Sequence, residues 1–275
     1  MKLIFVANLD DPALAPYRTL RRPVEHWRRG IFVAEGRLVV ERLLRSGLRV
    51  LSVLVVEEWA PRAAELLRGR PADLPVFVAR RRLVEKLVGF AYHQGYLAVA
   101  ECPRDPTLAE WLGRTGPPRT LVALDGVTSA ENVGCIVRNC AGLAAHGVLV
   151  GETACSPYLR RAVRNSLGGV FSLPILHLQD LAATLQELRD KHAFRIVAAE
   201  AQPRTPIAQL RFPPDVCVVL GHEDRGLSER VRLACQDFVT IPMSLGVEAL
   251  NVAAASAVFL YEIWRQKTLT TGFRV

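Results

Sequence analysis

Polar residues capable of binding and catalysis gather in three short segments of this sequence. The segments are DGVTSAEN (125–132), GHEDRGLS (221–228) and PMSLGVEAL (242–250), and each follows a run of apolar, strand-like residues. Because the carboxyl ends of parallel strands lie along one edge of a sheet, three such loops can converge on a single site. None of them contains GxGxxG or a Walker sequence, which disfavours ordinary dinucleotide or nucleoside triphosphate binding.

An amide directly after the third segment raises a question of burial. Asn251 is followed by the apolar run VAAASAVFL, and its neighbours predict a final helix from Ala249 to Trp264. An unpaired buried amide costs about 1–3 kcal/mol, so this side chain needs partners. We expect Asn251 to be buried against the loops of the site. The alternative is an amide at the start of the helix that bonds only to local backbone.

Strand-like runs alternate with helical runs along the whole chain, which predicts two α/β modules. Strand–helix repetition in the second module predicts a mostly parallel sheet covered on both faces. We predict a small α/β domain at 1–101, a linker at 102–119 and a larger α/β domain at 120–275. The predicted strands are 50–56, 75–79, 96–101, 120–127, 147–151, 194–199, 216–220 and 238–242, and the predicted helices are 35–44, 61–67, 82–88, 108–112, 131–145, 157–166, 180–191, 228–234 and 249–264.

Positive charge is concentrated in the first part of the chain. Residues 1–104 hold 18 Lys and Arg against 11 Asp and Glu, whereas residues 105–275 hold 17 against 16. All but four of the positive side chains are Arg, whose planar guanidinium suits phosphate binding and base stacking. This asymmetry predicts a polyanion-binding first module joined to a nearly neutral second one. The candidate contacts are the clusters Arg21/Arg22, Arg28/Arg29, Arg80/Arg81/Arg82 and Arg160/Arg161/Arg164.

Cysteine usage and hydropathy exclude several classes of protein. The six cysteines form no CxxC pair and have no His at a ligand-like spacing, which predicts reduced core thiols and no metal site. The opening MKLIFVANLDD has too short an apolar stretch for a signal segment. The most apolar predicted helix is interrupted by polar residues, which argues against a membrane span. We therefore expect a cytoplasmic protein.

Three motifs, taken together and in order, resemble the SpoU/TrmH class of SPOUT RNA ribose 2′-O-methyltransferases. They are ENVGCIVRNC (131–140), VVLGHEDRGLS (218–228) and IPMSLGVEALNVA (241–253), with RNSLGGVFSLPI (164–175) similar to the intervening segment. The first module resembles the ribosomal-protein-like substrate-binding domain often fused in front, through FVAEGRLVVERLLRSG (32–47) and HQGYLA (93–98). The resemblance covers nearly the whole chain.

The resemblance implies a fold and a cofactor. The fold is an α/β sheet domain whose C-terminal part is threaded as a trefoil knot, which chains generally avoid. The cofactor is S-adenosylmethionine, without a metal. Gly221 and Gly246 fit a site where the backbone must approach a ligand closely. The implied cofactor-binding residues are Leu220, Gly221, Ile241, Met243 and Leu250.

The resemblance also implies the catalytic residues. Arg138 matches the arginine often described as the base of the family, but a guanidinium is effectively always protonated. We expect its charge to stabilise the developing alkoxide and to hold the adjacent phosphate. Asn132 and Asn251 are expected to orient Arg138, the ribose or the cofactor, and Glu223 to complete their network.

One departure from the family pattern keeps alternatives open. The family usually has Ser two residues before the last Asn, where this sequence has Ala249. The favoured function is 2′-O-methylation of structured RNA, with rRNA preferred over tRNA because of the fused first module. The alternatives are an RNA-binding protein of this fold with weak or lost catalysis and a tRNA 2′-O-methyltransferase. A Rossmann-type oxidoreductase lacks its glycine fingerprint.

The apolar final helix also suggests an oligomer. Its residues are apolar on nearly every face, so that one face can cover the sheet and another needs a second cover. A symmetric partner would supply that cover, and homodimers through the C-terminal domain are common in the family. The alternative cover is the first module of the same chain.

Overall fold

The computed structural model describes residues 2–20, 22–71, 73–89, 92–202, 204–244 and 249–271, and the chain divides into two compact units. The first comprises Met1–Arg104 together with Tyr158–Phe171, and the second comprises Asp105–Pro157 and Ser172–Val275. The predicted domains 1–101 and 120–275 stay a prediction. Tyr158–Phe171 belongs to the first unit, although this segment lies within the range predicted for the second domain.

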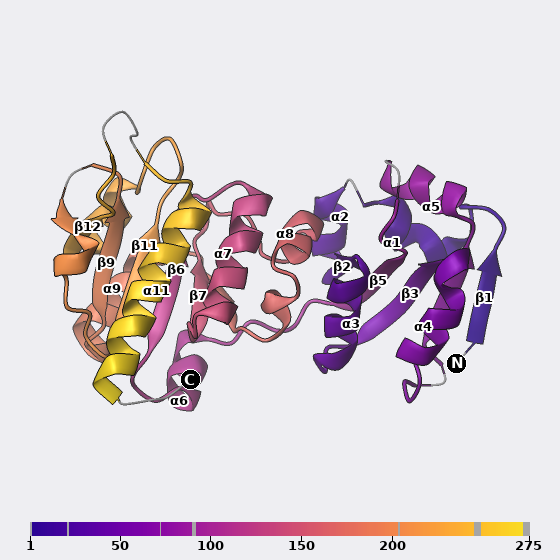
Figure 1. Cartoon of the computed structure of the whole chain (residues 1–275), viewed down its shortest axis with the longest axis horizontal. Coiled ribbons are helices and arrows are strands. Elements are labelled where there is room, and N and C mark those ends of the chain that lie inside the picture. The colour runs from indigo at the N-terminus through magenta and orange to yellow at the C-terminus, as the bar shows by residue number, and fades with distance from the viewer. Residues whose placement is uncertain are drawn as a thin grey trace. The chain divides into compact units, whose positions relative to one another are not determined.

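The first unit is built on a five-stranded mixed sheet with the strand order β1-β4-β3-β5-β2 (Figure 1). β4 pairs in parallel with β1 and β3, whereas β5 pairs antiparallel with β3 and β2. The elements are β1 (Lys2–Val6), α1 (Ala15–Arg18), α2 (Pro23–Arg28), β2 (Ile31–Glu35), α3 (Arg37–Arg45), β3 (Val50–Val56), α4 (Ala60–Leu66), β4 (Pro75–Ala79), α5 (Arg81–Val88), β5 (Tyr96–Glu101) and α8 (Arg160–Asn165), with short 3-10 helices at Pro12–Leu14, Glu57–Trp59 and Gly169–Phe171.

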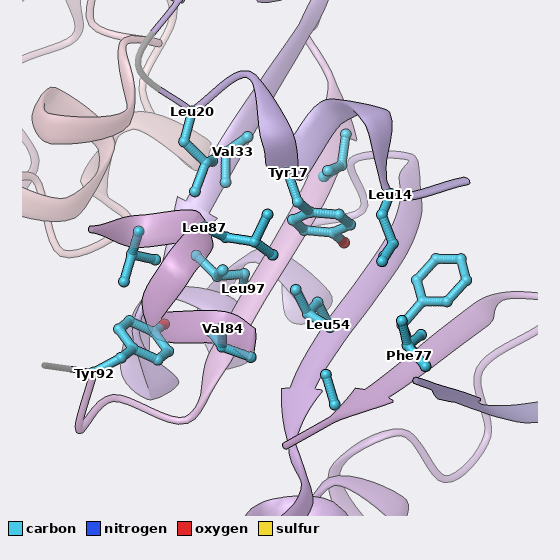
Figure 2. Close-up of a cluster of buried hydrophobic side chains, with 14 of the residues drawn as sticks. Leu14, Tyr17, Leu20, Val33, Leu54, Phe77, Val84, Leu87, Tyr92 and Leu97 are labelled. Atoms are coloured by element: carbon cyan, nitrogen blue, oxygen red, sulfur yellow. The ribbon is translucent and has the colours of Figure 1, made fainter. Parts of the chain in front are cut away.

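One face of this sheet carries the apolar core shown in Figure 2, where side chains from the strands meet those of α1 and α5. Tyr17 is fully buried in this core, and its hydroxyl lies 2.8 Å from Ser52 Oγ. Burial raises the pKa of the Tyr17 phenol well above its usual value, so the group stays neutral inside the core. The predicted strands at 50–56, 75–79 and 96–101 are confirmed.

An ion-pair cluster joins β2 to α8 within the first unit. Glu35 is only 1% exposed and accepts hydrogen bonds from Arg160 and, at 3.1 Å, from Arg164. Phe32 packs beside this pair, with its ring 5.5 Å from that of Tyr158 and 5.7 Å from that of Phe171. The segment is therefore held to this unit by both charge and apolar contact. This arrangement places two of the predicted polyanion contacts, Arg160 and Arg164, in a structural role.

The second unit contains a seven-stranded sheet in the order β10-β12-β9-β11-β6-β7-β8, and every neighbouring pair is parallel. The predicted mostly parallel α/β sheet is confirmed. The elements are α6 (Leu108–Arg114), β6 (Thr120–Leu124), α7 (Ala130–Gly142), β7 (Gly147–Val150), β8 (Ile175–His177), α9 (Leu181–His192), β9 (Arg195–Glu200), β10 (Thr205–Pro206), β11 (Val216–Leu220), α10 (Glu229–Ala234), β12 (Asp237–Thr240) and α11 (Val252–Thr271), with a 3-10 helix at Ile207–Gln209.

Both faces of this sheet are covered. α7 and α11 lie side by side over one face (Figure 1), and α6, α9 and α10 contribute to the apolar core on the other. Trp111 of α6 is 2% exposed in that core and donates from Nε1 to the His146 carbonyl oxygen at 3.0 Å. Part of the predicted linker is thus a helix with a buried anchor. The trefoil knot stays a prediction.

The final helix differs from its predicted bounds. α11 begins at Val252, three residues after the predicted start, and continues to Thr271, well beyond Trp264. Arg265, in the first of the added turns, forms an ion pair with Glu262 at 2.7 Å. Among the residues that the structure describes, no helix has the length and apolar character needed to cross a membrane.

Candidate functional site

The first of the three predicted loops ends in a capped helix. Ser129 is the N-cap of α7, and its Oγ accepts a hydrogen bond from the Asn132 backbone N–H at 3.2 Å. The buried residues Val133, Ile136, Val137 and Cys140 form a helical stripe against the sheet. This anchoring fixes Asn132 in the first turn of the helix, with its side chain at the edge of the sheet where the strands end.

The second loop folds back on itself in a tight turn after β11. His222 and Gly226 exchange backbone hydrogen bonds of 3.0 and 2.9 Å, and Gly226 has a φ of +67°. A Cβ at Gly221 would lie 2.6 Å from the carbonyl carbon of Gly226, closer than atoms can approach. The absence of a side chain at Gly221 is therefore required by the turn itself. The prediction from the sequence explains this glycine by close approach of a ligand, whereas the clash with Gly226 already excludes a side chain. Gly246, the other glycine of that prediction, lies outside the described residues.

The third loop delivers Asn251 to the start of α11. Asn251 precedes the first residue of the helix, and its Oδ1 accepts a hydrogen bond from the Ala253 backbone N–H at 2.9 Å. The prediction that Asn251 is buried against the loops of the site is wrong, because the side chain is exposed at a helix start. Amides are favoured at this position because they satisfy backbone donors that have no partner inside the helix.

A chain of side-chain hydrogen bonds nevertheless connects the three loops. Asn251 Nδ2 donates to Asn132 Oδ1 at 3.1 Å, and Asn132 Nδ2 donates to Glu223 Oε1 at 2.5 Å. The Nδ2 group of each asparagine thus donates to the next side chain in the series Asn251–Asn132–Glu223. Asn251 therefore caps its own helix, as the alternative expectation has it, but its bonds are not only local, because the side chain also reaches another loop. The convergence of the three predicted loops is observed.

A pocket of about 600 Å³ opens beside this chain of hydrogen bonds, within the range of roughly 300–1,000 Å³ usual for small-molecule sites. Glu223 and Asn251 line it, whereas Asn132 and Arg138 do not. Its lining includes all five predicted cofactor-binding residues, Leu220, Gly221, Ile241, Met243 and Leu250. Ala249, at the position of the expected Ser, also faces this pocket.

Glu200 and Arg232 are charged residues of the pocket that lie outside the three motifs. Glu200 follows the buried part of β9 and pairs with Arg232 of α10, whose guanidinium lies 4.7 Å from the Phe238 ring centre. A carboxylate at the end of a parallel strand is a signal for a ligand-facing residue. The sequence contains that signal, because Glu200 directly follows the strand predicted at 194–199.

Asp125, the first residue of the segment DGVTSAEN, is not among the predicted site residues. It directly follows β6, is 7% exposed, and accepts a hydrogen bond from the Ser228 backbone N–H at 2.6 Å. Its own N–H donates to the Leu220 carbonyl oxygen at 2.9 Å. Asp125 therefore ties the first loop to the second, and it holds the turn that carries Glu223.

Arg138 stands apart from this network. It lies six residues after Asn132 on α7, which places it about 9 Å further along the helix axis, and its side chain is exposed. Its side chain makes no hydrogen bond or ion pair with any other residue that the structure describes. The next residue, Asn139, donates from Nδ2 to the Ala253 carbonyl oxygen and to Ser256 Oγ, both at 2.9 Å. The guanidinium thus extends from a helix that is fixed to α11.

Four of the thiols, those of Cys140, Cys155, Cys217 and Cys235, are protonated at neutral pH. Burial raises the pKa of Cys155 to about 11 and that of Cys235 to about 12, and it raises those of Cys140 and Cys217 further. A thiol in that state is a poor nucleophile and a poor metal ligand. In the described part of the chain, no group of three or more His, Cys, Asp or Glu residues is arranged to hold a metal ion.

Comparison with known proteins identifies the class to which this fold and site belong. The model of the SpoU rRNA methylase family matches residues 119–261. An uncharacterised tRNA/rRNA methyltransferase of Mycobacterium bovis is 32% identical over 265 residues, covering 94% of this chain and 90% of the relative. The chain belongs to the SpoU rRNA methylase family.

Solved structures agree over almost the full length. The SpoU methyltransferase AviRb from Streptomyces viridochromogenes, in complex with S-adenosylmethionine, has a TM-score of 0.79 at 26% identity, over 93% of this chain and 99% of that one. An RNA 2′-O ribose methyltransferase has a TM-score of 0.80 at 26% identity, over 97% and 99% of the two chains. This protein is an S-adenosylmethionine-dependent RNA methyltransferase of the SpoU family with a SPOUT-type sheet domain.

The pocket fits that cofactor. Its volume accommodates a small molecule, and it is lined by both apolar and polar groups. The carboxylates of Glu200, Glu223 and Asp224 line it together with Arg225 and Arg232. S-adenosylmethionine carries a sulfonium, an ammonium and a carboxylate, so a pocket with charges of both signs suits it.

Proposed function

We propose that this protein transfers a methyl group to a ribose 2′-hydroxyl of rRNA in the cytoplasm, with Leu220, Gly221, Ile241, Met243 and Leu250 holding the cofactor. The observation that carries the proposal is the hydrogen-bonded chain Asn251–Asn132–Glu223 at the pocket. It brings together three residues, one from each motif, that the motif resemblance assigns to catalysis. It lies beside the pocket that fits a methyl donor.

Arg138 and the hydrogen-bonded residues Asn251, Asn132 and Glu223 have separate roles in the reaction. S-adenosylmethionine, when held by Leu220, Gly221, Ile241, Met243 and Leu250, would supply an electrophilic methyl group to the ribose oxygen, with its sulfur as the leaving group. Arg138 is a fixed positive charge that stabilises the developing alkoxide and holds the adjacent phosphate, while the hydroxyl proton passes to water. The Asn251–Asn132–Glu223 chain keeps the three loops in register, so that the acceptor oxygen can be aligned with the methyl group.

The test of this assignment is substitution of Arg138. R138A removes the charge, and we expect methyl transfer to fall at least 100-fold, because loss of one preorganised electrostatic group typically costs that much. The affinity for S-adenosylmethionine, measured by calorimetry, should stay within a few-fold, since Arg138 does not line the pocket. R138K keeps the charge but not the planar fork and should retain part of the activity. Transfer by R138A at the wild-type rate would refute the catalytic role.

The acceptor is identified by mapping ribose methylation in cells. RNA from cells with and without the gene is compared at every 2′-O-methylated position. Loss of one rRNA position supports the proposal, and loss of one tRNA position establishes the alternative substrate. Methylation of a base in place of a ribose would refute the 2′-O assignment.

Ala249 supports a second candidate function, an RNA-binding protein of this fold with weak or lost catalysis. The residue lines the pocket and has no hydroxyl to donate to a substrate or cofactor. Calorimetry with S-adenosylmethionine combined with methyl transfer to total RNA separates the two functions. Cofactor binding without transfer would favour the second.

A homodimer through α11 is part of the proposal. The buried side of this helix carries Phe259, Leu260 and Ile263, whereas Tyr261 is 52% and Leu269 71% exposed on it. A symmetric partner could cover these apolar groups. Sedimentation velocity is the direct measurement, and Y261R, which places a charge on the uncovered face, should shift a dimer toward monomer. A wild-type monomer at micromolar concentration would refute this part.

A further inference from the structure

One tryptophan of the first unit is exposed to an unusual degree. Trp27 of α2 is 74% exposed, and it is the most exposed large apolar side chain among the described residues. The other three tryptophans are accounted for by contacts within the fold: Trp59 lies against Tyr96, Trp111 is buried, and the Trp264 ring lies 6.2 Å from that of Tyr261. Trp27 has no such contact with any residue that the structure describes.

The apolar surface around Trp27 is small and surrounded by positive charge. Val24 is 57% exposed and lies three residues before Trp27, so the two side chains share one side of the helix. Arg22, Arg28 and Arg29 flank them and are all exposed. Arg22 pairs with Glu25 at 3.1 Å, whereas the side chains of Arg28 and Arg29 make no ion pair within the described ranges.

The opposite side of α2 is fixed to the unit. His26 is 7% exposed, and its Nε2 lies 2.9 Å from the Pro16 carbonyl oxygen and 3.0 Å from Thr19 Oγ1. The helix then passes through a turn at Gly30, with a φ of +61°, directly into β2. Because the neighbouring His26 is buried and fixes the orientation of α2, the Trp27 side chain projects into solvent.

We infer that Trp27, together with Arg28 and Arg29, forms a binding site for an unpaired nucleobase and its flanking phosphates in the RNA substrate. An indole offers a flat face on which any base can stack, and arginines track the backbone on either side. The inference rests on the proposed RNA substrate and names a recognition site within it. The excess of positive charge in residues 1–104 favours such a polyanion. A helix of six residues is too short to lie along a membrane as an amphipathic anchor.

The test compares two RNA probes. One is a stem–loop with eight unpaired loop nucleotides, and the other is a blunt duplex of the same stem sequence, each carrying a fluorescent label for anisotropy. W27A should bind the stem–loop about 5- to 150-fold more weakly, the range that base stacking contributes, and bind the duplex within two-fold of wild type. W27F, which keeps a smaller stacking face, should retain much of the stem–loop affinity. Trp27 emission should be quenched by the stem–loop.

Matched variants separate stacking from other effects. L38A removes another exposed apolar side chain of the same unit, at 48% exposure, and should leave both affinities unchanged. R28A and R29A should weaken both probes and each reduce the salt dependence of binding by about one phosphate contact. Because Trp27 is exposed, W27A should keep the wild-type circular dichroism spectrum and unfolding midpoint.

Three results would overturn the inference. They are unchanged stem–loop affinity of W27A, an equal loss on stem–loop and duplex, or Trp27-dependent binding to vesicles of phosphatidylserine and phosphatidylcholine with no effect on RNA. Each leaves the proposed methyl transfer intact, because that is measured separately through Arg138. Conversely, loss of stacking in W27A would stand even if R138A proved fully active.

Discussion

Asn251 offers a way to separate a structural role from a role in the site, because its two ends have different partners. Oδ1 accepts from the Ala253 N–H at 2.9 Å and caps α11, while Nδ2 donates to Asn132 at 3.1 Å. N251A removes both interactions. N251S keeps a hydroxyl that can cap the helix, since Ser and Asn are about equally good at this position, but it is too short to reach Asn132.

The magnitudes follow from these contacts. Loss of the cap costs about 1 kcal/mol of unfolding free energy. Loss of the Asn251–Asn132 bond costs at most about 0.5 kcal/mol, because both groups are accessible to water that can replace it. We therefore expect N251A to be less stable by about 1–1.5 kcal/mol and N251S by at most about 0.5 kcal/mol. Both variants should lose roughly tenfold in methyl transfer, the effect of one orienting hydrogen bond.

Urea unfolding followed by circular dichroism measures the first quantity, and transfer of labelled methyl to total RNA measures the second. T107A is the matched control, because Thr107 caps α6 in the same unit and does not line the pocket. It should cost about 1 kcal/mol and leave transfer unchanged. Equal destabilisation by N251A and N251S would refute the capping role, and wild-type transfer by N251S would refute the role of the bond to Asn132.

Three further predictions concern separate features of the chain. A249S restores a hydroxyl at the pocket and should raise methyl transfer about 2- to 10-fold, the value of one hydrogen bond; unchanged kinetics would show that this position is not used. E35A removes a carboxylate that is 1% exposed between two arginines and should lower the unfolding free energy by about 3–5 kcal/mol, against less than about 1 kcal/mol for E41A, whose ion pair is partly exposed; similar urea midpoints for the two would contradict this. Burial lowers the pKa of Lys267 from 10.5 to about 8, so between those values the unfolded chain binds a proton that the folded chain lacks, and the stability of the wild type relative to K267M should rise from pH 8 to pH 10; a difference independent of pH would exclude this burial effect.

The regular alternation of strands and helices was readable from the sequence where the segments were long and apolar. The strands at 75–79 and 216–220 have the predicted bounds, because a buried run of five β-branched and apolar residues has few alternatives. β8 was missed because it has only three residues, Ile175–His177, and β2 because IFVAE leads directly into a helix that dominates the pattern. Such short elements are specified by their partners in the sheet.

Tertiary contacts set the remaining differences. Tyr158–Phe171 follows a strand of the second unit in sequence but belongs to the first unit. Arg160 and Arg164 of this segment pair with Glu35 of the first unit. A local sequence pattern cannot predict a pairing between residues more than 120 positions apart. The Glu35 carboxylate was readable only as part of a family motif. The burial of Glu35, which gives Arg160 and Arg164 a structural role, follows from tertiary contacts and not from the local sequence.

At the site, the sequence motifs identify residues that matter, but the structure gives two of them a different role from the predicted one. Gly221 was assigned to ligand approach, yet its missing side chain is already required by the turn with Gly226. Asn251 was assigned to burial, yet it is an exposed cap that also reaches Asn132. Both residues therefore serve the local fold and the geometry of the loops at once. A substitution at either position must therefore change both stability and loop alignment. The contribution of either residue to methyl transfer can be measured only with pairs of variants that keep one role and remove the other.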